Sequence, residues 1–176
     1  MSEDKVIELV EKGGVYEDIP HKQTVIIAPH PDDEIIGCYK VLTGSIQPII
    51  IYSGNVEVKR RNEAMKLKEY IVLKAQLFLM SIPPNLLNEN SRFYFPDPYF
   101  ETHPSHREFG MMGEQMARQG IDVTFYTTNM TTPYIHEVKE VDKKEELLNN
   151  TYPSQKSLWE YEKKYILFEG YCKWIF

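Results

Sequence analysis

Residues 24–44, TVIIAPHPDDEIIGCYKVLTG, are the segment that most constrains how this chain can fold. The apolar, mostly β-branched run at residues 25–27 predicts a buried strand. Residues 34–43 place their apolar side chains close to one helical face, and Gly44 is a plausible helix stop. A strand followed directly by a turn and a helix is typical of open α/β sheets, in which ligands bind at the carboxyl ends of the strands.

The turn between this strand and helix concentrates one imidazole and three carboxylates, at His30, Asp32, Asp33 and Glu34, in a segment stiffened by two prolines. Imidazole and carboxylate together suit Zn²⁺, and a catalytic zinc keeps three protein ligands and one open position. His30 and Asp33 are three residues apart, so a tight turn can aim both at one point, while Asp32 points towards the open position. An acidic cluster can instead merely complement the helix dipole. The imidazole and the prolines in the same turn favour the metal site.

Residues 28–34 resemble the His-Pro-Asp-Asp-Glu signature of the LmbE/PIG-L family of zinc-dependent de-N-acetylases, with Pro29 inserted before the histidine. Residues 101–107, ETHPSHR, resemble the family's later His-Pro-Asp-His motif, with Ser105 where the family has Asp. The resemblance extends from about residue 24 to the C-terminus and is most specific in these two motifs. It implies a Rossmann-like α/β fold and removal of acetyl groups from N-acetylglucosaminyl substrates.

The resemblance also implies a role for each site residue. His30, Asp33 and His106 would bind the Zn²⁺ cofactor. Asp32 would be the general base that takes a proton from zinc-bound water, and His103 would stabilise the tetrahedral intermediate or protonate the leaving amine. Without the first motif, two histidines three residues apart at a helix start would more simply be partly exposed residues that share one face.

Ser105 is the departure from the family pattern with a functional consequence. The family's Asp orients and charges the acid histidine, whereas a serine hydroxyl accepts a hydrogen bond without carrying charge. Glu101, two residues before His103, is a candidate to replace that Asp. A weakened acid would make the protein a metal-containing relative that binds a sugar or metabolite with little turnover. A third alternative, a metal-free nucleotide-binding protein, is disfavoured because no Gly-x-Gly-x-x-Gly follows the first strand.

The whole chain, residues 1–176, is predicted to form a single domain. Alternating strands and helices predict a Rossmann-like three-layer α/β/α fold with a mostly parallel sheet of about five strands. Strands are expected at 25–27, 46–53, 76–81, 92–95 and 121–127. Helices are expected at 4–12, 34–43, 57–70, 104–119, 142–148 and 157–171.

Composition narrows the function further. The net charge is −6 and no basic stripe is present, which argues against a nucleic-acid surface. No apolar run approaches transmembrane length, and the N-terminal residues lack a signal-peptide core. Cys38 and Cys172 form no disulfide framework and are expected to be small buried side chains in a reducing cytosol. We therefore expect a cytoplasmic protein without a membrane span or a nucleic-acid partner, and the small-molecule amino-sugar substrate is what the resemblance implies.

Residues outside the two motifs are more ambiguous. Arg60 and Glu63 match an Arg-x-x-Glu that follows the family's second strand, but a helix-surface pair worth about 0.3 kcal/mol is the simpler interpretation. Ser154 and Gln155 resemble a family Ser-Gln pair and could either cap a helix or face substrate. The remaining histidines, His21 and His136, are expected at the surface. Five aromatic residues are expected in the core or in a homo-oligomer contact: Trp159, Tyr161, Tyr165, Phe168 and Trp174.

Overall fold

The computed structural model describes residues 22–45, 49–54, 58–67, 71–74, 90–129 and 134–174. Its strands are β1 Gln23–Ala28, β2 Ile50–Ser53, β3 Ile71–Lys74, β4 Ser91–Pro96, β5 Val123–Thr127, β6 Ile135–Glu137 and β7 Phe168–Cys172. Its helices are α2 Asp33–Gly44, α3 Val58–Ala64, α5 Pro104–Arg118, α6 Val141–Thr151, α7 Lys156–Tyr161 and α8 Lys164–Leu167, with a 3₁₀ turn η1 at Pro153–Gln155.

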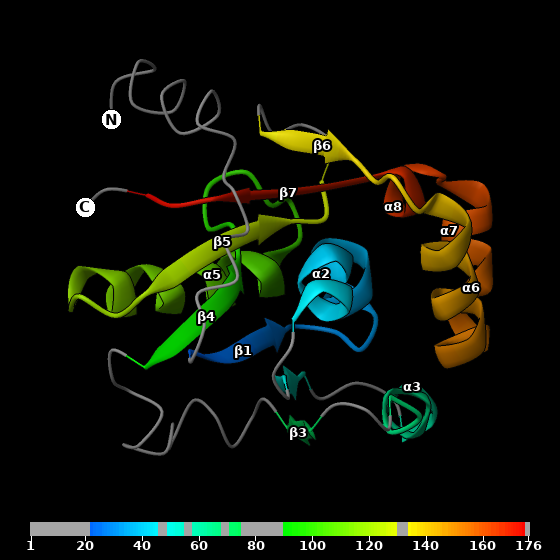
Figure 1. Cartoon of the computed structure of the whole chain (residues 1–176), viewed down its shortest axis with the longest axis horizontal. Coiled ribbons are helices and arrows are strands. Elements are labelled where there is room, and N and C mark those ends of the chain that lie inside the picture. The colour runs from blue at the N-terminus through cyan, green and yellow to red at the C-terminus, as the bar shows by residue number, and fades with distance from the viewer. Residues whose placement is uncertain are drawn as a thin grey trace.

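Within these residues the strands form one seven-stranded sheet of order β3-β2-β1-β4-β5-β7-β6 (Figure 1). The first five strands are parallel, and β7 runs antiparallel to both β5 and β6. The predicted three-layer α/β fold with a mostly parallel sheet is confirmed, with two more strands than expected. Among the described residues, no helix is both long and apolar enough to cross a bilayer.

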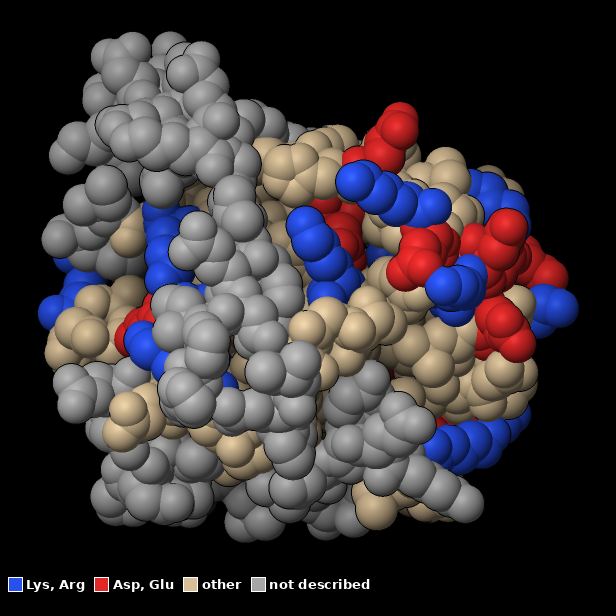
Figure 2. Space-filling view, in the orientation of Figure 1, with Lys and Arg blue, Asp and Glu red and all other residues tan. Residues whose placement is uncertain are grey.

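Both faces of the central strands are apolar because helices cover both of them. Val25 and Ile27 of β1 belong to one core cluster, which includes Met116 of α5. Ile26 and Ala28 face the opposite way and pack in the cluster that contains the buried side chains of α2. Figure 1 shows α2 between the sheet and the C-terminal helices α6, α7 and α8. Figure 2 shows acidic and basic side chains interleaved over the part of the surface on the side of these helices.

The strand order places a topological switch point between β1 and β4. The chain leaves β1 towards β2 on one side, whereas β4 is followed by β5 on the other side. In open α/β sheets the connections diverge at such a point and leave a crevice at the carboxyl ends of the two strands. The turn after β1 and the loop after β4 carry the two predicted histidine motifs, so both motifs meet at this crevice.

The C-terminal part of the chain differs from its sequence prediction. The helix expected at 157–171 is instead two short helices, α7 and α8, followed by the strand β7. Aromatic residues there suit a strand as well as a helix face, and pairing with β5 and β6 satisfies the strand's backbone. Gly170 permits the close pairing, since a Cβ at this position would lie 2.6 Å from the carbonyl oxygen of Tyr134. The strand β6 was not predicted either.

One other boundary differs from its prediction, and two expected elements lie outside the described residues. The helix expected at 57–70 is the shorter α3. The strand expected at 76–81 and the helix expected at 4–12 lie outside the described residues, and the structure has β3 at Ile71–Lys74, paired with β2. The predicted helix at 104–119 is confirmed as α5, with Pro104 in its first turn and Gly120 after its end at φ 84°.

Candidate metal centre and its pocket

The three predicted metal ligands each bring one atom to a common point. Nδ1 of His30 lies 3.3 Å from Oδ2 of Asp33 and 3.1 Å from Nε2 of His106. The third distance, between Nε2 of His106 and Oδ2 of Asp33, is 3.1 Å. Two ligands of a tetrahedral zinc ion, each about 2.0–2.1 Å from the metal, lie about 3.3 Å apart. Two imidazoles and one carboxylate at these separations therefore fit a catalytic zinc with one open position.

Local backbone geometry explains how the first motif reaches this point. The amide of Asp33 donates to the carbonyl oxygen of His30 at 3.2 Å, and the amide of His30 donates back to Oδ2 of Asp33 at 2.8 Å. Asp32 has φ 125°, the one positive φ found at a non-glycine among the described residues. Such strain is concentrated at functional sites. Gly54, after β2, lets the turn lie close, since a Cβ there would lie 1.6 Å from the carbonyl oxygen of Pro29.

Asp32 lies beside the metal ligands and has a different partner. Its carboxylate is 2% exposed and accepts a hydrogen bond from Nη2 of Arg60 at 2.6 Å. The same guanidinium nitrogen donates to the carbonyl oxygen of Pro31 at 2.8 Å. Burial raises the pKa of Asp32 well above its usual value, and Asp33 adds to this increase while Arg60 opposes it. A buried carboxylate with a raised pKa, held in place by a guanidinium, can act as a proton acceptor beside the metal point.

Charges at the ligand point favour a cation. Burial alone would lower the pKa of His106, yet Asp33 and Glu101 raise it to about 10. Burial alone would raise the pKa of Asp33, yet His106 and His30 hold it below its usual range. The carboxylates therefore stabilise positive charge at this point, whether that charge is carried by a proton or by a metal ion.

Glu101 contacts Nδ1 of His106, the ring nitrogen that does not face His30 and Asp33. Its Oε2 lies 3.1 Å from Nδ1 of His106, and its Oε1 accepts from the amide of Thr128 at 2.5 Å and from Oγ1 of Thr127 at 3.2 Å. The expectation that Glu101 orients His103 is corrected, because the carboxylate is committed to His106. A metal-ligating histidine commonly donates its second nitrogen to a carboxylate in this way.

His103 and Ser105 lie at the start of α5, next to His30. The hydroxyl oxygen of Ser105 is 2.8 Å from Nδ1 of His103 and 3.1 Å from Nε2 of His30. Partial desolvation and the neighbouring imidazoles of His30 and His106 lower the pKa of His103. The three imidazoles also bring one nitrogen each to within 4.8 Å of one another. The atoms of His30, Asp33 and His106 lie closer together, at 3.1–3.3 Å, so this set is the tighter candidate for holding a metal ion.

The loop that carries Glu101 and His103 is fixed by a fully buried carboxylate at Asp97. Oδ1 of Asp97 accepts from the amides of Tyr99 and Phe100 at 2.7 and 2.8 Å. Oδ2 accepts from the hydroxyl of Tyr134 at 2.5 Å and from Nε1 of Trp174 at 2.8 Å. Asp97 thus connects the loop's own amides to Tyr134, before β6, and to Trp174, after β7. Sequence reasoning assigned no role to Asp97.

The ligand atoms open into a pocket of about 540 Å³. Asp32, Arg60 and His103 line it together with the three predicted ligands. Six further lining residues come from the loop after β5, from η1 and from the C-terminal helices, and sequence reasoning offered a substrate-facing role for Gln155 alone among them. They are Thr128, Asn129, Gln155, Leu158, Lys164 and Tyr165. Of the five aromatic residues expected in the core or a subunit contact, Trp159 and Trp174 are buried, Phe168 on β7 is half-buried, Tyr161 is exposed and Tyr165 faces this pocket.

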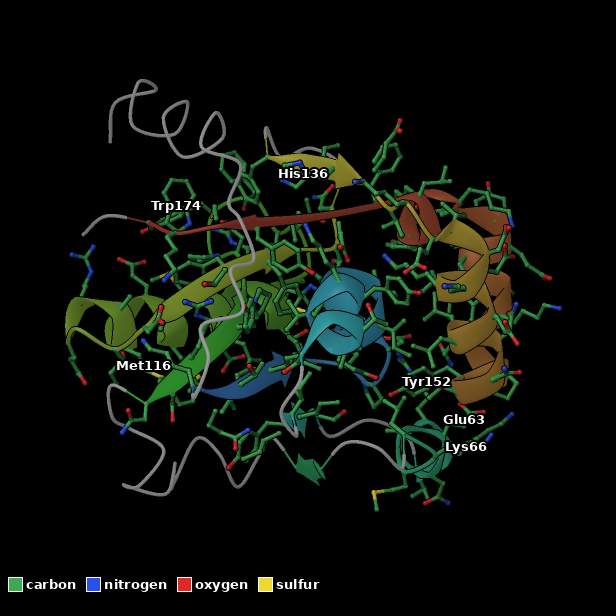
Figure 3. All side chains as sticks on the ribbon, in the orientation of Figure 1. Glu63, Lys66, Met116, His136, Tyr152 and Trp174 are labelled. Atoms are coloured by element: carbon green, nitrogen blue, oxygen red, sulfur yellow. The ribbon has the colours of Figure 1, made fainter. Side chains whose placement is uncertain are left out.

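Arg60 and Glu63 have partners other than each other. Glu63 is 6% exposed and accepts from the amide and the hydroxyl of Ser154, at 3.2 and 2.5 Å. The interpretation of a solvent-exposed helix pair is therefore wrong. In Figure 3, the labelled Glu63 on α3 and Tyr152 after α6 lie close together where these segments meet. Ser154 thus links η1 to α3, and this link places Gln155 against the pocket.

Two other sequence predictions concern residues outside the pocket. His136 is exposed on β6, as expected (Figure 3). Cys38 and Cys172 are both buried free thiols, also as expected. His21 lies outside the described residues.

The arrangement combines a cation site, a buried carboxylate and a solvent-facing imidazole around one pocket. Such a constellation is suited to hydrolysis, in which one group accepts a proton from water and another donates a proton to a leaving group. No protein-family model matches the chain, and no curated protein matches its sequence. Function is therefore inferred from the geometry of the site and from the resemblance in its two motifs.

Proposed function

We propose that this protein is a zinc-dependent hydrolase that removes an acetyl group from an N-acetylated amino sugar or glycoconjugate of the N-acetylglucosaminyl type. The observation that carries the proposal is the close approach of three ligand atoms from His30, Asp33 and His106, at 3.1–3.3 Å from one another. This donor set and spacing match a catalytic zinc with three protein ligands. The resemblance to the LmbE/PIG-L family supplies the substrate class.

Each side chain would contribute a distinct step. When bound, zinc would polarise the acetyl carbonyl and lower the pKa of a water molecule to about 7. Asp32 would accept a proton from the attacking water, with Arg60 holding the carboxylate in place. The water oxygen would first add to the carbonyl carbon, and His103 would then protonate the leaving amine as the C–N bond breaks and acetate is released. Glu101 would keep the ring of His106 in its binding orientation.

The pocket suits a sugar with part of its aglycone. Its volume of about 540 Å³ is within the usual range for small-molecule sites, about 300–1,000 Å³. Arg60, Asn129 and Gln155 provide polar groups for sugar hydroxyls, while Leu158 and Tyr165 provide an apolar wall. We place the activity in the cytosol, where the two free thiols would stay reduced.

An acetate-release screen tests the proposal. Zinc-loaded protein would be incubated with N-acetylglucosaminyl compounds that differ in aglycone, and the released acetate would be measured. We expect release that depends on zinc and is lost in Asp33→Asn, with Ser157→Ala on the exposed side of α7 as a matched control. Zinc binding without acetate release from any compound would favour the alternative, a metal-containing sugar-binding protein. No zinc binding after reconstitution would remove the foundation of the proposal.

A further inference from the structure

The hydroxyl of Ser105 bridges a metal ligand and the candidate acid. It lies 3.1 Å from Nε2 of His30 and 2.8 Å from Nδ1 of His103. The two rings meet edge to face, with centroids 4.7 Å apart and an interplanar angle of 83°. His30 presents Nε2 to the serine and has Nδ1 beside Asp33 and His106, whereas His103 presents Nδ1 to the serine. One oxygen atom therefore contacts both rings.

A hydroxyl has a single hydrogen and two lone pairs, so it can donate one hydrogen bond while it accepts another. If Nδ1 of His30 binds the metal, that nitrogen carries no proton, so the proton of the neutral ring is on Nε2. Nε2 of His30 then donates to the oxygen of Ser105. The serine hydrogen can then be donated to Nδ1 of His103, and in this arrangement the neutral ring of His103 carries its proton on Nε2.

We propose that Ser105 is a positioning residue. Metal binding at Nδ1 of His30 fixes the tautomer of His30, and the hydroxyl of Ser105, which contacts both rings, in turn fixes the tautomer of His103. The inference rests on the proposed function, because it takes Nδ1 of His30 as a metal ligand. Its consequence is that neutral His103 presents an N–H donor towards the pocket. A carboxylate at position 105 can only accept a hydrogen bond, so it would place the proton of His103 on Nδ1 instead. Ser105 thus orients His103 through a different tautomer from the one that an Asp at this position would favour.

Long-range ¹H–¹⁵N NMR of histidine-labelled protein reads these tautomers directly. In the zinc-loaded protein we expect the Nε2–H tautomer for both His30 and His103. Ser105→Thr should retain this state because it keeps the hydroxyl, and Ser105→Ala should leave His103 as a mixture of tautomers. Ser105→Asp should reverse His103 to the Nδ1–H tautomer. Ser157→Ala, at an exposed serine on α7, should leave both spectra unchanged.

The zinc-free protein provides the second comparison. Without zinc, His30 is not held as a donor, so the tautomer preference of His103 should weaken in wild type and stay unchanged in Ser105→Ala. In acetate release, Ser105→Ala should lower kcat by about 10–100-fold with little change in KM, and Ser105→Thr should restore it.

Three results separate the failure of this inference from that of the proposed function. A His103 spectrum that is identical in wild type and Ser105→Ala, while zinc shifts the nitrogens of His30 and His106, overturns the role of Ser105 alone. An Nδ1–H tautomer at His103 in the zinc-loaded wild type does the same. If zinc shifts neither His30 nor His106, the metal site and the proposed function fail, and the inference fails with them.

Discussion

Asp32 and Asp33 are adjacent in the chain but have separate partners. Oδ2 of Asp33 lies within 3.3 Å of a nitrogen from each of two histidines, whereas Oδ2 of Asp32 lies 2.6 Å from the guanidinium of Arg60. The positive φ of Asp32 turns the chain so that neighbouring side chains diverge. The two carboxylates look equivalent in the sequence, but substitution of Asp33 and substitution of Asp32 are expected to affect zinc binding and turnover differently.

We expect Asp33→Asn to weaken zinc binding and acetate release together, because the change removes an anionic ligand. Asp32→Asn should keep zinc but lower turnover by on the order of 10²–10⁴-fold, as expected for a missing general base. Zinc stoichiometry and the rate of acetate release are measured for both variants at equal protein concentration. Loss of metal in Asp32→Asn with retention in Asp33→Asn would invert the two roles.

Glu101 gives a second prediction at the residue scale. Its carboxylate contacts Nδ1 of His106 and is held by the amide of Thr128. Glu101→Gln keeps the shape but removes the charge that favours the ligating tautomer, so zinc affinity should fall by about 10–100-fold. Competition with a chelator measures the affinity. Glu108→Gln, at an exposed position on α5, is the matched control, and equal affinities in the two variants would contradict the role of Glu101.

At the scale of elements, Asp122 connects several strands at the end of the sheet that lies opposite the pocket. It precedes β5 and accepts from Lys22 before β1 at 2.8 Å, from Arg92 on β4 at 3.1 Å, and from Lys173 after β7. Burial alone would raise the pKa of Asp122, but these cations hold it below its usual value of 3.8. The carboxylate is therefore more stable ionised in the folded chain than in the unfolded one.

The sign of this pKa shift sets a pH dependence. Because the folded pKa is depressed, the contribution to stability is complete above pH 3.8 and is lost as the pH falls through the folded pKa. We expect Asp122→Asn to lower the free energy of unfolding at neutral pH by about 1.5–3 kcal/mol. Urea titrations at a series of pH values should show the gap between variant and wild type shrinking below pH 3.8. A gap that is independent of pH would show that the charge is not responsible.

At the scale of the whole molecule, a metal ion would cross-link two segments that are far apart in the chain. His30 and Asp33 come from the turn after β1, and His106 comes from α5. A ligand that binds only the folded state raises the free energy of unfolding, by about 2.7 kcal/mol at a free concentration of 100 times Kd.

We therefore expect one zinc per chain and a higher melting temperature with zinc than with chelator. Elemental analysis and thermal unfolding in the two conditions measure these quantities. Asp33→Asn should abolish the difference in melting temperature. The same zinc-induced increase in that variant would place the ion elsewhere.

The sequence by itself determined four of the five parallel strands and the two motifs of the site. Short apolar strands alternating with amphipathic helices predicted β1, β2, β4 and β5, because burial on both faces of a parallel sheet leaves a distinct local pattern. The motif residues could be found because their types and spacing are local too. His30 and Asp33 share one turn, and Pro104 marks the start of the helix that carries His106.

Only the tertiary structure decided which groups act together around those motifs. The carboxylate of Glu101 contacts His106, the guanidinium of Arg60 contacts Asp32, and the hydroxyl of Ser105 contacts His30 as well as His103. The Arg60–Asp32 and Ser105–His30 contacts join residues that are 28 and 75 positions apart in the chain. The strand β7 was missed for the same reason: its backbone is satisfied by pairing with β5 and β6, which a local pattern does not encode. Spacing along the chain fixes what a single turn or helix can present, whereas hydrogen-bond partners across the sheet depend on how the elements pack.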